Sequence, residues 1–97
     1  MNKQNEDFET FKNEGIDFIT RMIKCLRGAP IVGVAFSKEI DELEVKASTL
    51  LNVSTREEWK TVVDNTINPL FASLDRELAF RFDISVDYVL DLEGFRY

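Results

Sequence analysis

The 97-residue chain contains no histidine and a single cysteine, Cys25. Histidine supplies the base of most nucleophilic triads and many zinc ligands, so its absence argues against both kinds of site. One cysteine can form no internal disulfide and no cysteine-rich metal cage. Cys25 follows Met22 by three residues on an apolar helical stripe, where a small core residue is expected. The sequence predicts neither a cofactor nor a metal site.

Long apolar runs are also missing. The longest, residues 29–36, is far shorter than the roughly 20 residues of a membrane span. The N-terminal sequence MNKQNEDFETF has no basic-then-apolar signal pattern. With four glycines and two prolines, the composition is that of a packed globular chain. We expect one compact, cytoplasmic domain over residues 1–97, with residues 1–5 frayed and no membrane association.

Positive charge is scarce: 12 Lys and Arg stand against 18 Asp and Glu, which gives a formal net charge of −6. Binding to DNA or RNA draws much of its strength from Lys and Arg at the phosphates, and no concentrated basic face is evident. Nucleic acid is therefore not expected as a partner. The acidic surface favours solubility, or a protein partner with a basic surface.

Most of the chain has helical periodicity. Apolar residues recur every three or four positions over residues 8–26, and Gly15 marks a point where this helix is expected to bend or to pack closely on a neighbour. A second helix is predicted over residues 37–51. Two overlapping capping boxes within residues 54–58 predict a third helix, and Asn68-Pro69 predicts the start of a fourth.

Two segments have the pattern of strands. Residues 31–36 are apolar, rich in β-branched side chains and preceded by Pro30, which favours a short buried strand. Over residues 80–92 apolar and polar side chains alternate, and only Val89 breaks the polar set. The sequence therefore predicts an α+β fold with about four helices and these two strands. If residues 80–92 are helical instead, the fold is all-α.

Gly28 and Gly33 have the spacing of P-loop glycines. Val34 and Ala35 stand where such a loop needs its phosphate-binding lysine and its magnesium-binding hydroxyl. The match is accidental, and Gly28 is explained as the stop signal of the first helix.

Two resemblances to known families concern short segments. Residues 47–54, ASTLLNVS, and residues 83–90, DISVDYVL, resemble pieces of Cro/C1-type helix-turn-helix repressors, which implies helices in both segments and a DNA-binding role. Glu58 and Thr61 fall where that family's second helix has apolar residues. Residues 66–70, TINPL, look like a short segment of tailed-phage portal proteins, and no function is carried over from that likeness.

We interpret the chain as a non-enzymatic, acidic protein-interaction module: a small inhibitor, an immunity-type protein, an adaptor or an assembly subunit, with a phage-related origin left open. The alternatives are a divergent helix-turn-helix regulator and a small enzyme that uses carboxylates. Contacts with the partner are predicted on the acidic face of the C-terminal strand or at the acidic start of the second helix. The candidates are Arg81, Asp83, Asp87, Asp91, Glu39 and Glu42. An exposed edge of the C-terminal strand would also permit a homodimer.

Overall fold

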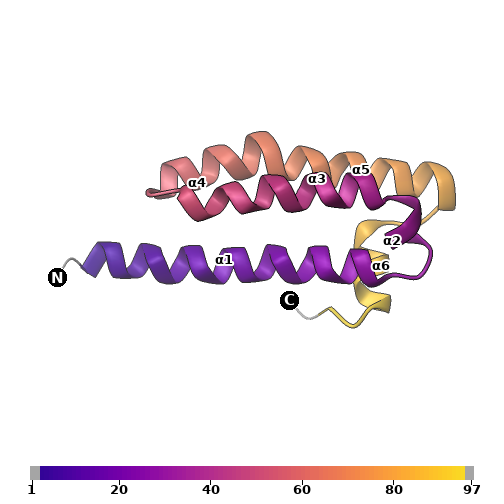
Figure 1. The fold of residues 1–97 in the computed structure, drawn as a ribbon, viewed down its shortest axis with the longest axis horizontal. Coiled ribbons are helices and arrows are strands. Elements are labelled where there is room, and N and C mark those ends of the chain that lie inside the picture. The colour runs from indigo at the N-terminus through magenta and orange to yellow at the C-terminus, as the bar shows by residue number, and fades with distance from the viewer. Residues whose placement is uncertain (1–2, 96–97) are drawn as a thin grey trace.

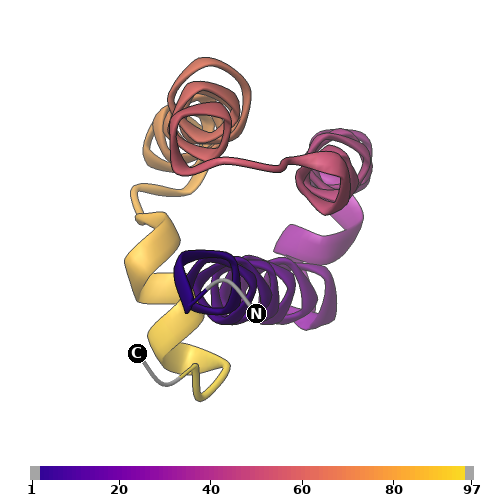
Figure 2. The same cartoon turned by 90° about the vertical axis from the view of Figure 1, so that its left-hand side faces the viewer.

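Three long helical segments run side by side along the molecule (Figure 1). The computed structural model describes the backbone of residues 3–95 and the side chains of residues 7–95. The first segment is α1 (Lys3–Gly28) and the second is α3 (Ser37–Ser48), which the 3₁₀ turn η1 (Thr49–Asn52) extends. The third consists of α4 (Arg56–Val62), the π-helical turn η2 (Val63–Ile67) and α5 (Asn68–Phe82). Seen end-on, they form the corners of a triangle (Figure 2).

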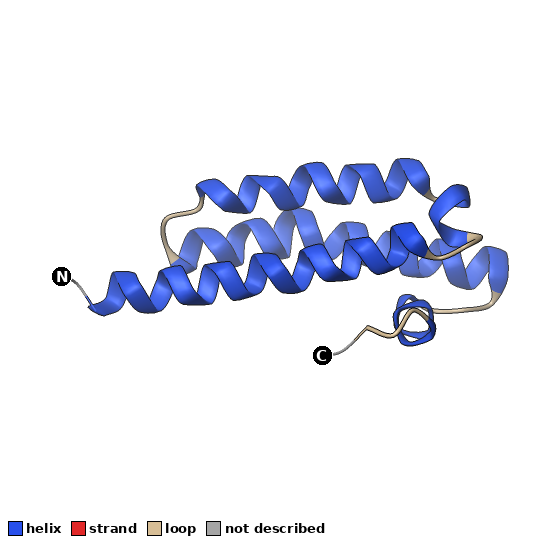
Figure 3. Cartoon of the chain, turned by 60° about the horizontal axis from the view of Figure 1, so that its bottom comes forward, coloured by secondary structure: helices blue, strands red, loops and turns tan. Residues whose placement is uncertain are grey.

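Two short helices complete the fold. The single turn α2 (Val32–Ala35) links α1 to α3 at one end of the bundle, and α6 (Val86–Leu92) packs against both α1 and α5. Figure 3 shows α6 nearly end-on while the long helices lie along the page, so α6 crosses them steeply. The fold of residues 3–95 is all-helical and contains no strand, so the predicted α+β class is wrong and its all-α alternative is correct (Figure 3).

The predicted strand at residues 80–92 is instead the end of α5, a turn, and α6. Asp83 adopts a left-handed conformation, with φ 56° and ψ 39°, and ends α5. The Ser85 side chain then caps α6 by accepting a hydrogen bond from the backbone N–H of Tyr88. Val89, which interrupted the alternation, is buried with Val86 and Leu90 at helical spacing. The alternation therefore arose by chance across two helices. A period of two places apolar and polar side chains on opposite faces only when the backbone is an extended strand.

The predicted strand at residues 31–36 is wrong as well, because this segment forms α2. Val32 and Phe36 lie four residues apart and are both buried, whereas Ile31 and Val34 are exposed. A single helical turn places the first pair on one side and the second on the other. No neighbouring strand exists within the described residues to satisfy an extended backbone, so β propensity is overridden by tertiary packing.

The third and fourth predicted helices are one continuous rod over residues 56–82. Asn68 does not cap a new helix there, because Ile67 before it is already helical. Proline inside an α-helix lacks an N–H and its ring crowds the preceding turn. The wider π-helical turn that ends at Ile67, just before Asn68-Pro69, accommodates both effects, and the Thr66 hydroxyl in this turn donates to the carbonyl of Val62 at the end of α4.

The core lies along the axis on which the long helices and α6 converge. Within residues 7–95 the buried side chains are all hydrophobic. The largest fully buried ones are Phe36, Leu26, Ile40, Leu43, Leu50, Ile67, Leu74, Leu78 and Leu90. Residues 1 and 2, part of the segment expected to be frayed, lie outside the described residues, and α1 begins at Lys3. Among residues 3–95, no helix combines the length and the apolar character that crossing a bilayer requires.

Candidate binding groove

The structure separates the acidic residues that were predicted to bind a partner. Glu39 and Glu42 lie on α3, the first half-buried and the second exposed. Asp87 and Asp91 are exposed and lie one turn apart on α6. In the end-on view α3 and α6 are on opposite sides of α1 (Figure 2). The two groups therefore form no single surface, and their role in binding stays a prediction.

Arg81 and Asp83 have structural roles at the end of α5. The Arg81 guanidinium is 5.1 Å from the ring centroid of Phe36 and its Nε is 3.7 Å from a carboxylate oxygen of Glu77. Asp83 is the left-handed residue that ends the helix. Because no strand runs through these positions, the strand edge that predicted a homodimer does not exist.

A more concentrated feature is an open groove of about 300 Å³ between α1 and the rod formed by α4, η2 and α5. Its walls are mainly apolar and include four aromatic rings. The lining residues are Phe11, Gly15, Phe18, Ile19, Met22, Trp59, Val63, Ile67, Asn68 and Phe71. We call this feature the aromatic groove.

The bottom of the aromatic groove is set by the close approach of Trp59 to α1. A Cβ atom built on Gly15 would lie 2.5 Å from Cζ2 of Trp59, so only glycine leaves room for the indole ring. Phe11 packs edge-on against Trp59, with ring centroids 5.4 Å apart. The guanidinium of Arg56 lies 4.4 Å from the Phe11 ring centroid, in cation–π geometry. The expectation that Gly15 allows close packing is thereby confirmed.

The other end of the aromatic groove meets the segment that follows α6. Phe95 is buried and its ring lies edge-on to Phe18, with centroids 5.3 Å apart. Arg21 lies over both rings, 5.4 Å from the Phe95 centroid and 5.9 Å from the Phe18 centroid. The chain turns into this contact at Gly94, whose φ is 78°. The groove is therefore the part of the α1–α5 face that α6 and Phe95 leave open.

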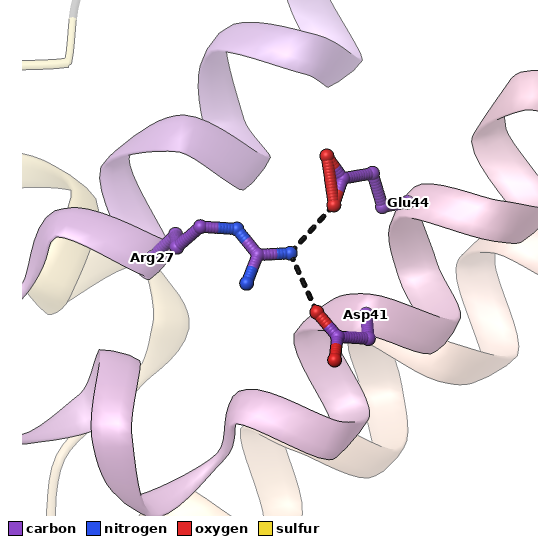
Figure 4. A network of polar contacts seen from close by, with 3 residues as sticks. All are labelled: Arg27, Asp41 and Glu44. Atoms are coloured by element: carbon purple, nitrogen blue, oxygen red, sulfur yellow. Dashed lines mark hydrogen bonds and ion pairs between the residues drawn. The ribbon is translucent and has the colours of Figure 1, made fainter.

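A second groove, of about 390 Å³, lies between α1 and α3. Its polar end carries Arg27, whose Nη2 is 2.9 Å from Asp41 and 2.6 Å from Glu44 (Figure 4). The hydrogen bond with Asp41 and the negative charges of Glu44 and Asp41 outweigh desolvation and raise the pKa of Arg27 above its usual value. Its cation is thus already neutralised by two carboxylates, which leaves little attraction for an anionic ligand.

The far end of α3 is also tied to α1. The ammonium group of Lys12 donates to the carbonyl oxygens of Leu51 and Val53, each at 2.8 Å. Together with the Arg27 contacts, these bonds hold α1 and α3 together at two separate places. The groove between α1 and α3 is thus bounded by structural contacts at both ends.

No cluster of three or more His, Cys, Asp and Glu side chains in the described part of the chain is placed to hold a metal ion. Cys25 is half-buried and packs against the hydrophobic core, as expected for a small core residue.

Comparison with known proteins gives no relative: no family model, curated protein or solved structure matches this chain. The aromatic groove was not predicted from the sequence, because the apolar residues that line it were assigned to the core-facing stripes of the first, third and fourth predicted helices. The apolar arc of the first helix is broad, since Phe18 and Ile16 differ by about 160° around a helix that turns about 100° per residue. One neighbouring helix cannot cover an apolar arc of this width. The width of the arc was therefore the signal that could have located the groove.

Proposed function

We propose that this chain is a non-enzymatic protein-interaction module that binds its partner in the aromatic groove. The supporting observation is the open groove itself, where four aromatic rings from α1 and the α4–α5 rod line one surface. Aromatic residues and arginine dominate the binding energy of protein interfaces, and Phe11 of the groove already packs against both Trp59 and Arg56. An inhibitor, an immunity-type protein, an adaptor or an assembly subunit would use such a groove.

The acidic surface supports the same proposal. A net charge of −6 on 97 residues accelerates encounter with a partner that presents a basic surface. The groove then supplies the apolar contacts that hold the complex once it has formed. The net charge thus affects the rate of association, and the groove affects how long the complex lasts.

Site-specific photo-crosslinking in the native host tests this function. A photoreactive phenylalanine analogue replaces Phe11 in the groove or, as the control, Phe80, which is 88% exposed on α5 and does not line the groove. We expect position 11 to crosslink to one protein and position 80 to crosslink to none. An excess of the unlabelled chain should reduce the crosslinked product from position 11. Equal products from both positions, or none from position 11, would contradict the proposal.

A further inference from the structure

The proposed function leaves open what kind of segment fills the aromatic groove, and α6 supplies a precedent. It lies against α1 and α5, the same elements that wall the groove, and buries Val86, Val89 and Leu90 there. A short helix with apolar residues at positions i, i+3 and i+4 therefore already matches one end of this face. The open part is lined by the preceding turns of α1 and, on the other wall, by the start of α5 together with η2 and α4.

The charged residues around the groove favour a basic occupant. Asp7, Phe11, Glu14 and Phe18 follow one another at four- and three-residue steps, so the two acids lie along the same ridge of α1 as the two rings. Asp7 and Glu14 are exposed and form no ion pair with another side chain of residues 7–95. These carboxylates are available to a cationic partner.

The cations of the opposite wall are already engaged. Arg56 stacks on Phe11, and the Lys60 ammonium lies 3.6 Å from a carboxylate oxygen of Asp64. A second copy of the chain is a poor occupant, because it brings a charge of −6 to a surface of the same sign. The charge pattern instead complements a helix whose apolar stripe is flanked by Lys or Arg.

Resting on the proposed function, we infer that the aromatic groove binds a basic amphipathic helix of another protein. The helix packs beside α6, inserts its apolar stripe between Phe11, Met22 and Phe71, and places its cations near Asp7 and Glu14. Its binding adds a helix to the α1–α5 face and covers the small part of the largely buried Trp59 that remains exposed in the groove.

Trp59 is the only tryptophan and lines the groove, so its fluorescence reports occupancy directly. The probe is an 18-residue Leu/Lys peptide with leucine at helical spacing. The controls are a scrambled peptide of the same composition and a Leu/Glu peptide with the same leucine spacing. We expect the basic amphipathic peptide to shift Trp59 emission saturably with one-to-one stoichiometry, and the other two to bind at least about tenfold more weakly.

Two matched pairs of variants locate the binding. Phe11→Lys is compared with Phe80→Lys, the same change on an exposed phenylalanine outside the groove, and Glu14→Lys with Glu9→Lys, the same charge change at an exposed position on another side of α1. The groove variants should weaken the peptide about fivefold or more, and the controls less than about twofold. Circular dichroism checks that each variant folds. If Phe11→Lys does not fold, the Glu14→Lys variant still tests the inference, because Glu14 is exposed.

Several results would overturn the inference. Equal binding of the scrambled peptide would show nonspecific charge attraction, and preference for the acidic peptide would reverse the proposed chemistry. Dimerisation abolished by Phe11→Lys in sedimentation equilibrium would make a second copy the occupant. If crosslinking from position 11 identifies a partner segment that is neither basic nor helical, the inference fails while the proposed function stands.

Discussion

At the scale of single residues, Gly15 decides how closely the third helical segment approaches α1. The indole of Trp59 occupies the space of the missing side chain, and any Cβ there would overlap the ring. This contact sets the depth of the aromatic groove as well as local packing. Stability and the shape of the groove are therefore linked at one position.

Replacing Gly15 tests that link. Gly15→Ala gains roughly 1 kcal/mol in helix propensity, but displacing a buried ring costs roughly 1–3 kcal/mol, so we expect a net loss of about 1 kcal/mol. Urea denaturation measures the loss, and the emission of Trp59 should change in the folded state. Gly28→Ala is the matched control, since the nearest atom to its Cβ is 3.9 Å away. Similar stability changes in both variants would refute the packing explanation.

At the scale of elements, the turn between α5 and α6 determines the fold class. Asp83 ends α5 in the left-handed conformation and Ser85 caps the start of α6. The turn at residues 83–85 therefore divides the segment that was predicted as one strand into two helices. Asp and Asn tolerate the left-handed region better than other non-glycine residues, because their short polar side chains bond locally. This tolerance is why Asp83 did not stand out as a helix stop.

Substitutions at Asp83 distinguish a helix stop from a strand. With φ at 56°, Asp83→Gly should keep or raise stability by up to about 1 kcal/mol, whereas Asp83→Val should lower it by about 1 kcal/mol or more. In a strand the order would be the reverse, because valine favours and glycine disfavours extended structure. Thermal unfolding followed by circular dichroism measures both variants. A more stable valine variant would contradict the left-handed cap.

At the scale of the whole molecule, the bundle is elongated. The Cα radius of gyration is 14.5 Å, against about 12.5 Å for a compact domain of this length, and the principal extents are 50 × 25 × 17 Å. Side-by-side helices of this length expose much surface relative to volume. The long faces of α1 and of the α4–α5 rod therefore offer room for a partner helix.

Small-angle scattering tests the shape and the mode of binding together. We expect the isolated chain to scatter as a monomer with a radius of gyration at or slightly above 14.5 Å and a maximum dimension near 50 Å. Binding of the Leu/Lys peptide in the groove should thicken the cross-section without lengthening the long axis. A particle that becomes longer on binding would place the peptide at an end of the bundle.

The sequence predicted the helical segments that carry strong local signals. Periodicity located most of α1 and α3, and a capping box located the start of α4, where the N–H of Glu58 donates to the Thr55 hydroxyl at 3.1 Å. It did not predict that Pro69 lies within a continuous rod, because proline at a first helical turn and proline after a π-helical turn share the same local pattern. The aromatic groove was missed for a related reason, since Phe11 and Phe18 satisfy the same periodicity as the buried residues.

What the sequence alone determined is the negative charge, the lack of histidine and of any internal disulfide in these 97 residues, and the helices whose caps and apolar stripes are local. The tertiary structure decided the fold class, because residues 31–36 and 80–92 have no strand partner in the described chain and the apolar side chains that they do bury are at helical spacing. It also decided which aromatic residues enter the core and which line an open groove. Both outcomes depend on where neighbouring helices end, and the spacing of residues along one chain does not contain that information.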